Sequence, residues 1–152
     1  MITAPATAYK HLLAAVDFSP GTEAMMQRVM DLVKHYGAHL SVIHVVEYLP
    51  VAMDAELMLP PLAGVEEQLL ENARKRLEEL TTSLGLDQVG RYVELGSTKL
   101  EILRVAEAQG VDLIVVGSHG RHGLARMLGS TANAVLQASH CDVLAVRTAG
   151  QA

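Results

Sequence analysis

Tryptophan is absent from this chain of 152 residues, and phenylalanine and cysteine each occur once. The single thiol, Cys141, cannot form an internal disulfide, and its place in an apolar run is typical of a buried structural cysteine. Half of the residues are hydrophobic but only 3% are aromatic, so the core must be aliphatic. Aliphatic residues of this kind are typical of strands that helices bury on both faces.

An excess of positive charge and long apolar runs are also missing. The formal net charge is −5, so we expect no binding to nucleic acid. The short basic cluster at residues 74–76 is typical of a solvated helix face with pairs such as Glu71 with Lys75. No apolar stretch reaches the ~18 residues of a membrane span. The first residues do not resemble a signal peptide. We therefore expect a cytoplasmic protein that does not engage a membrane.

Short apolar runs alternate with helical patterns along the chain. The expected strands are residues 12–16, 39–46, 89–95, 112–116 and 142–147. The expected helices run from about Ser19 to Tyr36 and over 65–84, 98–109 and 130–139. Alternation of this kind predicts a doubly wound parallel sheet in one domain, residues 1–152, with flexible ends at 1–8 and 148–152.

Local signals support these boundaries. Ser19 followed by Pro20 is typical of a helix cap and first turn, and Ser97 is a second cap candidate. The stretch 47–64 contains three prolines and is long for a connection. We expect it to be a partly ordered excursion that covers the open end of the sheet, a ligand or a partner chain.

A glycine-rich loop near the C-terminus is the stretch most informative about function. Gly117, Gly120 and Gly123 lie between a buried strand and a helix, where glycine lets a ligand approach the backbone closely. Residues 129–131, Gly-Ser-Thr, open the next helix, whose free N–H groups and dipole favour an anion. The residues alone leave two interpretations open, namely a phosphate site or a turn in which Ser130 only caps the helix. The loop matches neither a P-loop nor the dinucleotide fingerprint.

The chain as a whole resembles the universal stress protein family. Residues 9–19, YKHLLAAVDFS, are similar to the family's first strand and its Asp-x-Ser motif. Residues 40–45, LSVIHV, are similar to its second strand, and residues 112–120 and 141–146 to its last two strands. The resemblance implies an α/β fold with an open five-stranded parallel sheet of order 3-2-1-4-5 and helices on both faces, of the Rossmann-like or adenine nucleotide alpha hydrolase-like type.

In that strand order the switch point lies between strands one and four, where open α/β sheets bind ligands. The nucleotide-binding branch of the family carries Gly-x2-Gly-x9-Gly-Ser/Thr. Gly117, Gly120, Gly129 and Ser130 match this motif in kind, but eight residues rather than nine separate Gly120 from Gly129. A spacing of this kind also resembles a branch that is regarded as not binding ATP, although that branch has lost these glycines.

The resemblance implies an adenine nucleotide, ATP or AMP, in this crevice, with Asp17 close to the phosphates and to a Mg²⁺ ion. It places the base against Ala15, Val16 and the backbone of Val45. It places the ribose and phosphates against Gly117, His119, Gly120, Gly129, Ser130 and Thr131. Asp17 has an alternative role as a cap of the first helix, and His44 has one as a hydrogen-bonded core histidine. His119 and His122 lack the third ligand that a metal site needs.

Catalysis has little support, because no nucleophile–base pair or set of metal carboxylates is apparent. At most we expect weak ATP hydrolysis. We expect instead a stress-response regulator that binds an adenine nucleotide and acts on an unidentified regulatory protein partner. The alternative is a dimeric interaction module of the same fold that binds no nucleotide. Residues 141–146 form an apolar edge without proline, and the resemblance implies a homodimer through this last strand.

Overall fold

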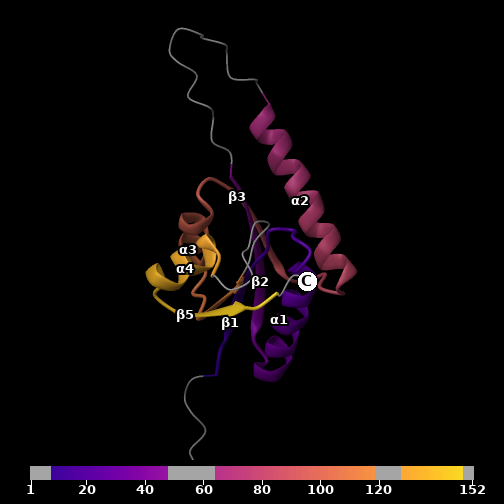
Figure 1. Cartoon of the computed structure of the whole chain (residues 1–152). Coiled ribbons are helices and arrows are strands. Elements are labelled where there is room, and N and C mark those ends of the chain that lie inside the picture. The colour runs from indigo at the N-terminus through magenta and orange to yellow at the C-terminus, as the bar shows by residue number, and fades with distance from the viewer. Residues whose placement is uncertain (1–7, 48–63, 119–127, 149–152) are drawn as a thin grey trace, which may run out of the picture.

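The computed structural model describes residues 8–47, 64–118 and 128–148. Strands and helices alternate along these ranges (Figure 1). In chain order the elements are β1 (His11–Ala15), α1 (Thr22–Tyr36), β2 (His39–Val46), α2 (Val65–Ser83), β3 (Gly90–Leu95), α3 (Thr98–Ala108), β4 (Leu113–Gly117), α4 (Ser130–Ala138) and β5 (Asp142–Val146). The expected excursion at 47–64 and the expected flexible ends fall almost wholly outside the described residues.

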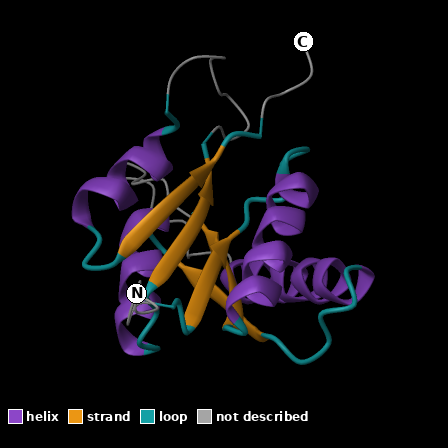
Figure 2. Cartoon of the chain, turned by 90° about the horizontal axis from the view of Figure 1, so that it is seen from below, coloured by secondary structure: helices purple, strands orange, loops and turns teal. Residues whose placement is uncertain are grey.

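The five strands form one parallel sheet in the order β3-β2-β1-β4-β5. This order confirms the expected topology. β1 lies at the centre, where Leu12 is in register with Leu40 of β2 and with Leu113 of β4. Helices pack on both faces of the sheet (Figure 2). None of the described helices is both long enough and apolar enough to cross a membrane.

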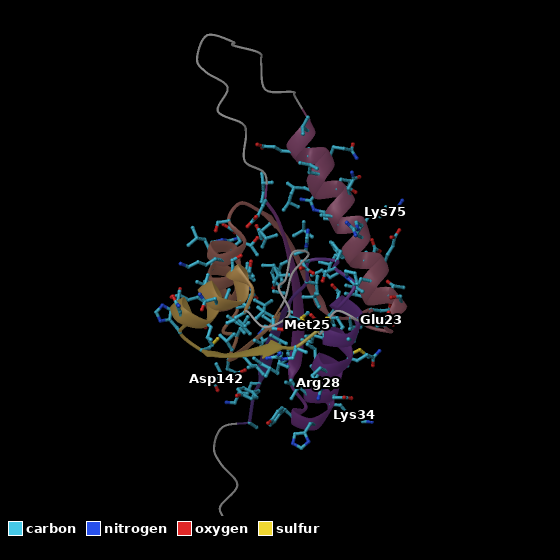
Figure 3. The ribbon with its side chains drawn as sticks, viewed as in Figure 1. Glu23, Met25, Arg28, Lys34, Lys75 and Asp142 are labelled. Carbon is cyan, nitrogen blue, oxygen red and sulfur yellow. The ribbon has the colours of Figure 1, made fainter. Side chains whose placement is uncertain are left out.

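The core has two aliphatic layers, one on each face of the sheet. Successive residues of a strand point to opposite faces, so the fully buried Leu12 packs under α1 and α2 while the fully buried Leu13 packs under α3 and α4. On α1, Met25 points towards the sheet and Glu23 points away from it (Figure 3). The aliphatic composition therefore serves a sheet that is covered on both sides.

The start of α1 corrects one prediction. Ser19 does not cap this helix, because the residue at the N-cap position is Gly21, which has no side chain to donate or accept. Asp17 organises the turn instead. Its Oδ1 atom accepts a hydrogen bond from the Ser19 backbone N–H at 2.9 Å and one from the Thr22 hydroxyl at 3.4 Å. Asp17 therefore shapes the approach to α1 without being its N-cap residue.

The other two serine cap candidates differ from each other. Ser97 is the N-cap of α3, and its Oγ atom accepts a hydrogen bond from the Leu100 N–H at 3.5 Å, which confirms the prediction. In α4 the N-cap is Gly129 and no side chain caps the helix. The interpretation of Ser130 as an N-cap is therefore wrong, since Ser130 is the first helical residue and is exposed.

This difference predicts two unequal alanine variants. Ser97→Ala should lower the free energy of unfolding by about 0.5–1 kcal/mol, because it removes a cap acceptor. Ser130→Ala should change it by less than about 0.5 kcal/mol, as is usual for an exposed side chain that makes no special contact. Urea denaturation of both variants checks this. An equal loss in the two proteins would contradict the assignment of the caps.

Candidate functional site

A cavity of about 780 Å³ lies at the carboxyl ends of β1, β2 and β4. It is lined by the residues that end these strands and by residues that begin α1 and α4. Its volume is within the range of small-molecule sites, roughly 300–1,000 Å³. It also includes the switch point between β1 and β4, where ligands bind in open α/β sheets. Topology and volume therefore select the same place.

The structure brings most of the predicted site residues together around this cavity. His119 and Gly120 lie outside the described residues. The others line the cavity: Ala15, Val16, Asp17, Val45, Gly117, Gly129, Ser130 and Thr131. They come from three strand ends and one helix start, which are far apart in the sequence. Their roles as ligand contacts stay predictions.

Part of the cavity lining is polar and comes from loops and helix starts. Asp17 is exposed there, and while its Oδ1 atom holds the turn before α1, its Oδ2 atom has no hydrogen-bond partner among the described residues. Hydroxyl groups line the cavity at Ser19, Thr22, Ser130, Thr131 and Thr148. This set combines one available carboxylate oxygen with several neutral hydrogen-bonding groups.

Gly21 allows the cavity wall to close between α1 and the segment after β5. A Cβ atom added to Gly21 would lie only 2.4 Å from the Cβ atom of Thr148. A glycine is needed at such an approach, because any larger residue would have to push the two segments apart. Thr148 thereby reaches the cavity although it follows the last strand.

The rest of the lining is apolar and comes from both layers of the protein. Leu69 and Ala73 of α2 contribute from one face of the sheet and Ile102 of α3 from the other. Val45 and Val46 end β2 between these two sides. A cavity with an apolar part and a hydroxyl-rich part suits a ligand that has an apolar group and a polar group.

Two aromatic rings and one cationic side chain stack at the cavity wall. His44 Nδ1 lies 2.7 Å from the carbonyl oxygen of Val16, and the His44 ring lies 4.4 Å from the ring of Phe18. Phe18 has a φ of 57°, which makes it the one non-glycine residue with positive φ among the described residues. On its ring lies the guanidinium of Arg76 from α2, with Cζ 4.3 Å from the ring centroid.

Comparison with known proteins decides the family. A sequence model of the universal stress protein family matches residues 8–147. The chain belongs to the universal stress protein family. Universal stress protein A homolog 1 of Coxiella burnetii is 41% identical to it over 138 residues, which cover 91% of this chain and 96% of that protein.

Solved structures of universal stress proteins share the fold. Universal stress protein UspA from Lactobacillus plantarum matches with a TM-score of 0.69 at 23% identity, covering 93% of this chain and 99% of that one. A universal stress protein in complex with cAMP matches with a TM-score of 0.60 at 24% identity, again covering 93% and 99%. The family and the Rossmann-like fold predicted from the sequence are thus confirmed.

Two side chains of this universal stress protein line the cavity, which the sequence did not predict. His44 is hydrogen-bonded as expected, but it is half-buried and lines the cavity rather than the core. Arg76 is exposed, as expected for the cluster 74–76, but it also lines the cavity. In that cluster Glu71 pairs with Arg74 at 3.4 Å, and no pair with Lys75 is present among the described residues.

Sequence reasoning also missed Phe18 and Arg76 as parts of the site. Phe18 stands inside the quoted Asp-x-Ser motif, at its variable position, so its place in the motif gave a usable signal. Nothing in the sequence marked Arg76, because its role depends on which way α2 is turned over the sheet. The other charged side chains among the described lining residues, Asp17 and Glu47, are acidic.

Proposed function

We propose that this universal stress protein is a cytoplasmic stress-response regulator that binds an adenine nucleotide, ATP or AMP, in the cavity at the ends of β1 and β4. The observation that carries the proposal is the cavity itself, with its apolar and hydroxyl-rich parts at the switch point. A universal stress protein of the same fold has been solved in complex with cAMP, which is also an adenine nucleotide. The regulatory protein partner is unidentified.

The backbone of Val45 is suited to the edge of an adenine ring. The carbonyl of Ile43 points towards β1, where it accepts a hydrogen bond from the N–H of Val16 at 2.9 Å. The carbonyl of Val46 points the other way, towards the N–H of Gly96 at 3.0 Å. The N–H and C=O groups of successive residues in a strand point to alternate sides. Those of Val45 therefore point to the same side as those of Ile43, towards β1, but they lie beyond the last residue of β1 that pairs with β2. Adenine can donate and accept hydrogen bonds at such a place.

The start of α4 is suited to the phosphates. The first N–H groups of a helix have no partner within the helix, and the helix dipole favours negative charge there. Ser130 and Thr131 add hydroxyl groups at the same place. The free Oδ2 atom of Asp17 would repel phosphate by itself but would bind it through a Mg²⁺ ion, whose preferred ligands are carboxylate and phosphate oxygens. We therefore expect Mg²⁺ to strengthen ATP binding.

Calorimetric titration of the purified protein tests the proposal. ATP and AMP should bind, ATP more tightly with Mg²⁺ than without it, and GTP more weakly than ATP because guanine presents different groups at its edge. Absence of a binding signal for both adenine nucleotides would contradict the proposal. It would favour the second candidate, a dimeric interaction module of the same fold.

The edge strand β5 supports a homodimer whether or not the protein binds a nucleotide. β5 pairs with β4 on one side and with no other strand among the described residues, and Val143 to Val146 are only half-buried. Asp142 at its start (Figure 3) accepts a hydrogen bond from the Tyr9 hydroxyl at 2.8 Å, which raises the pKa of Tyr9. An apolar edge of this kind favours pairing with another chain. We propose that two copies pair through β5, antiparallel across a two-fold axis.

Leu144→Lys should weaken this dimer at least about tenfold, because it brings two like charges close to the axis and desolvates them. Light scattering measures the effect, and circular dichroism shows whether the variant is folded. Leu136→Lys is the matched control, since Leu136 is 50% exposed on α4 and lies outside the edge. A monomeric wild type, or a folded Leu144→Lys protein that stays dimeric, would exclude this interface.

A further inference from the structure

We infer that Arg76 is the cationic group through which this cavity binds the phosphate chain of its ligand. The inference rests on the proposed nucleotide function and adds a residue from α2 to a site otherwise made of strand ends and loops. Arg76 lines the cavity together with Leu69, Asn72 and Ala73, which lie on the same side of α2 at helical spacing. This side of the helix therefore faces the site.

The guanidinium of Arg76 packs on a stack of side chains at the cavity wall, although Arg76 is itself exposed. It lies on the ring of Phe18, 4.3 Å from the ring centroid, a distance typical of a cation–π contact. The Phe18 ring in turn lies against His44, and His44 is tied to the backbone at the end of β1 through the carbonyl of Val16. The stack connects α2 to the strand end that borders the cavity.

Phe18 adopts a costly backbone conformation to take part in this stack. Its φ of 57° is in the left-handed region, which residues with a bulky side chain rarely adopt. Strain of this kind gathers at ligand sites, where the surrounding structure enforces it. The strained residue follows Asp17 directly, so one turn places both the carboxylate and the ring that carries Arg76.

Apart from its contact with the Phe18 ring, the charge of Arg76 has no partner among the described residues. Arg76 makes no ion pair and donates no hydrogen bond to any described residue, whereas Arg74, two positions earlier, pairs with Glu67 and Glu71 at 3.4 Å. All five N–H donors of the Arg76 guanidinium thus remain available. A guanidinium binds phosphate oxygens in a bidentate manner, with charge assistance.

Arg76 also supplies positive charge to a cavity whose other described charged lining residues are acidic. It is the one Lys or Arg among the described lining residues, beside the carboxylates of Asp17 and Glu47. The Oε1 atom of Glu47 accepts hydrogen bonds from the Thr98 hydroxyl at 2.6 Å and the Thr98 N–H at 3.3 Å, while its Oε2 atom has no partner among the described residues. Among the described lining residues, Arg76 is therefore the one cationic side chain that a polyphosphate would meet.

The test compares Arg76→Gln with the matched control Arg74→Gln, which removes the same charge from the solvent side of the same helix. Calorimetry is done with ATP, AMP, adenosine and inorganic tripolyphosphate. We expect Arg76→Gln to weaken ATP and tripolyphosphate about tenfold, as for loss of a charge-assisted hydrogen bond. AMP should lose less and adenosine nothing, and Arg74→Gln should bind all four as the wild type does.

The outcomes separate this inference from the proposed function. If the wild type binds ATP and Arg76→Gln binds it equally well, the role of Arg76 is excluded while nucleotide binding stands. Equal losses for ATP and adenosine, or equal losses in both variants, would also exclude a phosphate contact. If tripolyphosphate binds in an Arg76-dependent way but adenine nucleotides bind no better than it does, the anion site stands and the adenine function fails. Absence of all binding would overturn both.

Discussion

Ala15→Phe is expected to abolish measurable ATP binding, a loss of more than about 100-fold, while the protein stays folded. Ala15 is the last residue of β1, is half-buried, and lines the cavity where the base is proposed to bind. A phenyl ring at this position would occupy the space of the adenine. Because the new ring enters an existing cavity, we expect a stability cost of only about 1 kcal/mol, at the lower end for overpacking. Calorimetry measures the affinity and urea denaturation the stability.

Leu100→Phe is the matched control for this variant. Leu100 is 60% exposed on α3 and does not line the cavity, so a phenyl ring there should leave ATP affinity unchanged. If Ala15→Phe binds ATP as tightly as the wild type, the base does not lie against the end of β1. The site would then need to be placed elsewhere, whatever the result for Arg76.

Leu77→Ala is expected to have the largest effect on stability, about 3 kcal/mol. Leu77 is fully buried and joins α2 to the layer formed by α1 and the central strands. Deleting a buried leucine side chain leaves a cavity and typically costs about 2–5 kcal/mol. Since α2 also carries Ala73 and Arg76, a loosened helix should weaken ATP binding as well.

Urea denaturation of Leu77→Ala and Leu136→Ala provides the comparison. The same chemical change at Leu136, which is 50% exposed on α4, should cost less than about 1 kcal/mol. A loss below about 1 kcal/mol for Leu77→Ala would show that α2 is not held by this contact. The account of how the cavity wall is positioned would then be wrong.

The fold could be predicted from the sequence because its main signals are local. Apolar runs of strand length alternate with helical patterns, and strands buried on both faces leave few alternatives to a parallel sheet. The strand order came from resemblance to a family rather than from the residues. Helix starts were harder, because Ser19 and Ser130 each stand near a helix start where a glycine, Gly21 or Gly129, is the N-cap. A difference of one or two residues decides such an assignment.

The site was predictable where it follows from strand ends. Asp17 follows β1 closely and Gly117 ends the neighbouring β4, so the topology alone brings them to one edge of the sheet. The position of Phe18 in the site depends on its positive φ. The position of Arg76 depends on the rotation of α2 about its own axis. The rotation of α2 leaves no pattern in one sequence, and the one signal for Phe18 was its place inside the Asp-x-Ser motif. Thr148 was missed for a similar reason, since only the close approach of Gly21 brings it to the cavity.

The central claim is that an adenine nucleotide binds at the carboxyl ends of β1 and β4, and mapping of backbone amide resonances by NMR tests it most directly. During titration with ATP and Mg²⁺, the amides of Val45 and Thr131 should shift in a saturable manner. Those of Lys10 and Gly90, near the amino ends of β1 and β3, should stay unchanged. Unchanged spectra at saturating ATP, or shifts confined to the amino ends of the strands, would contradict the claim.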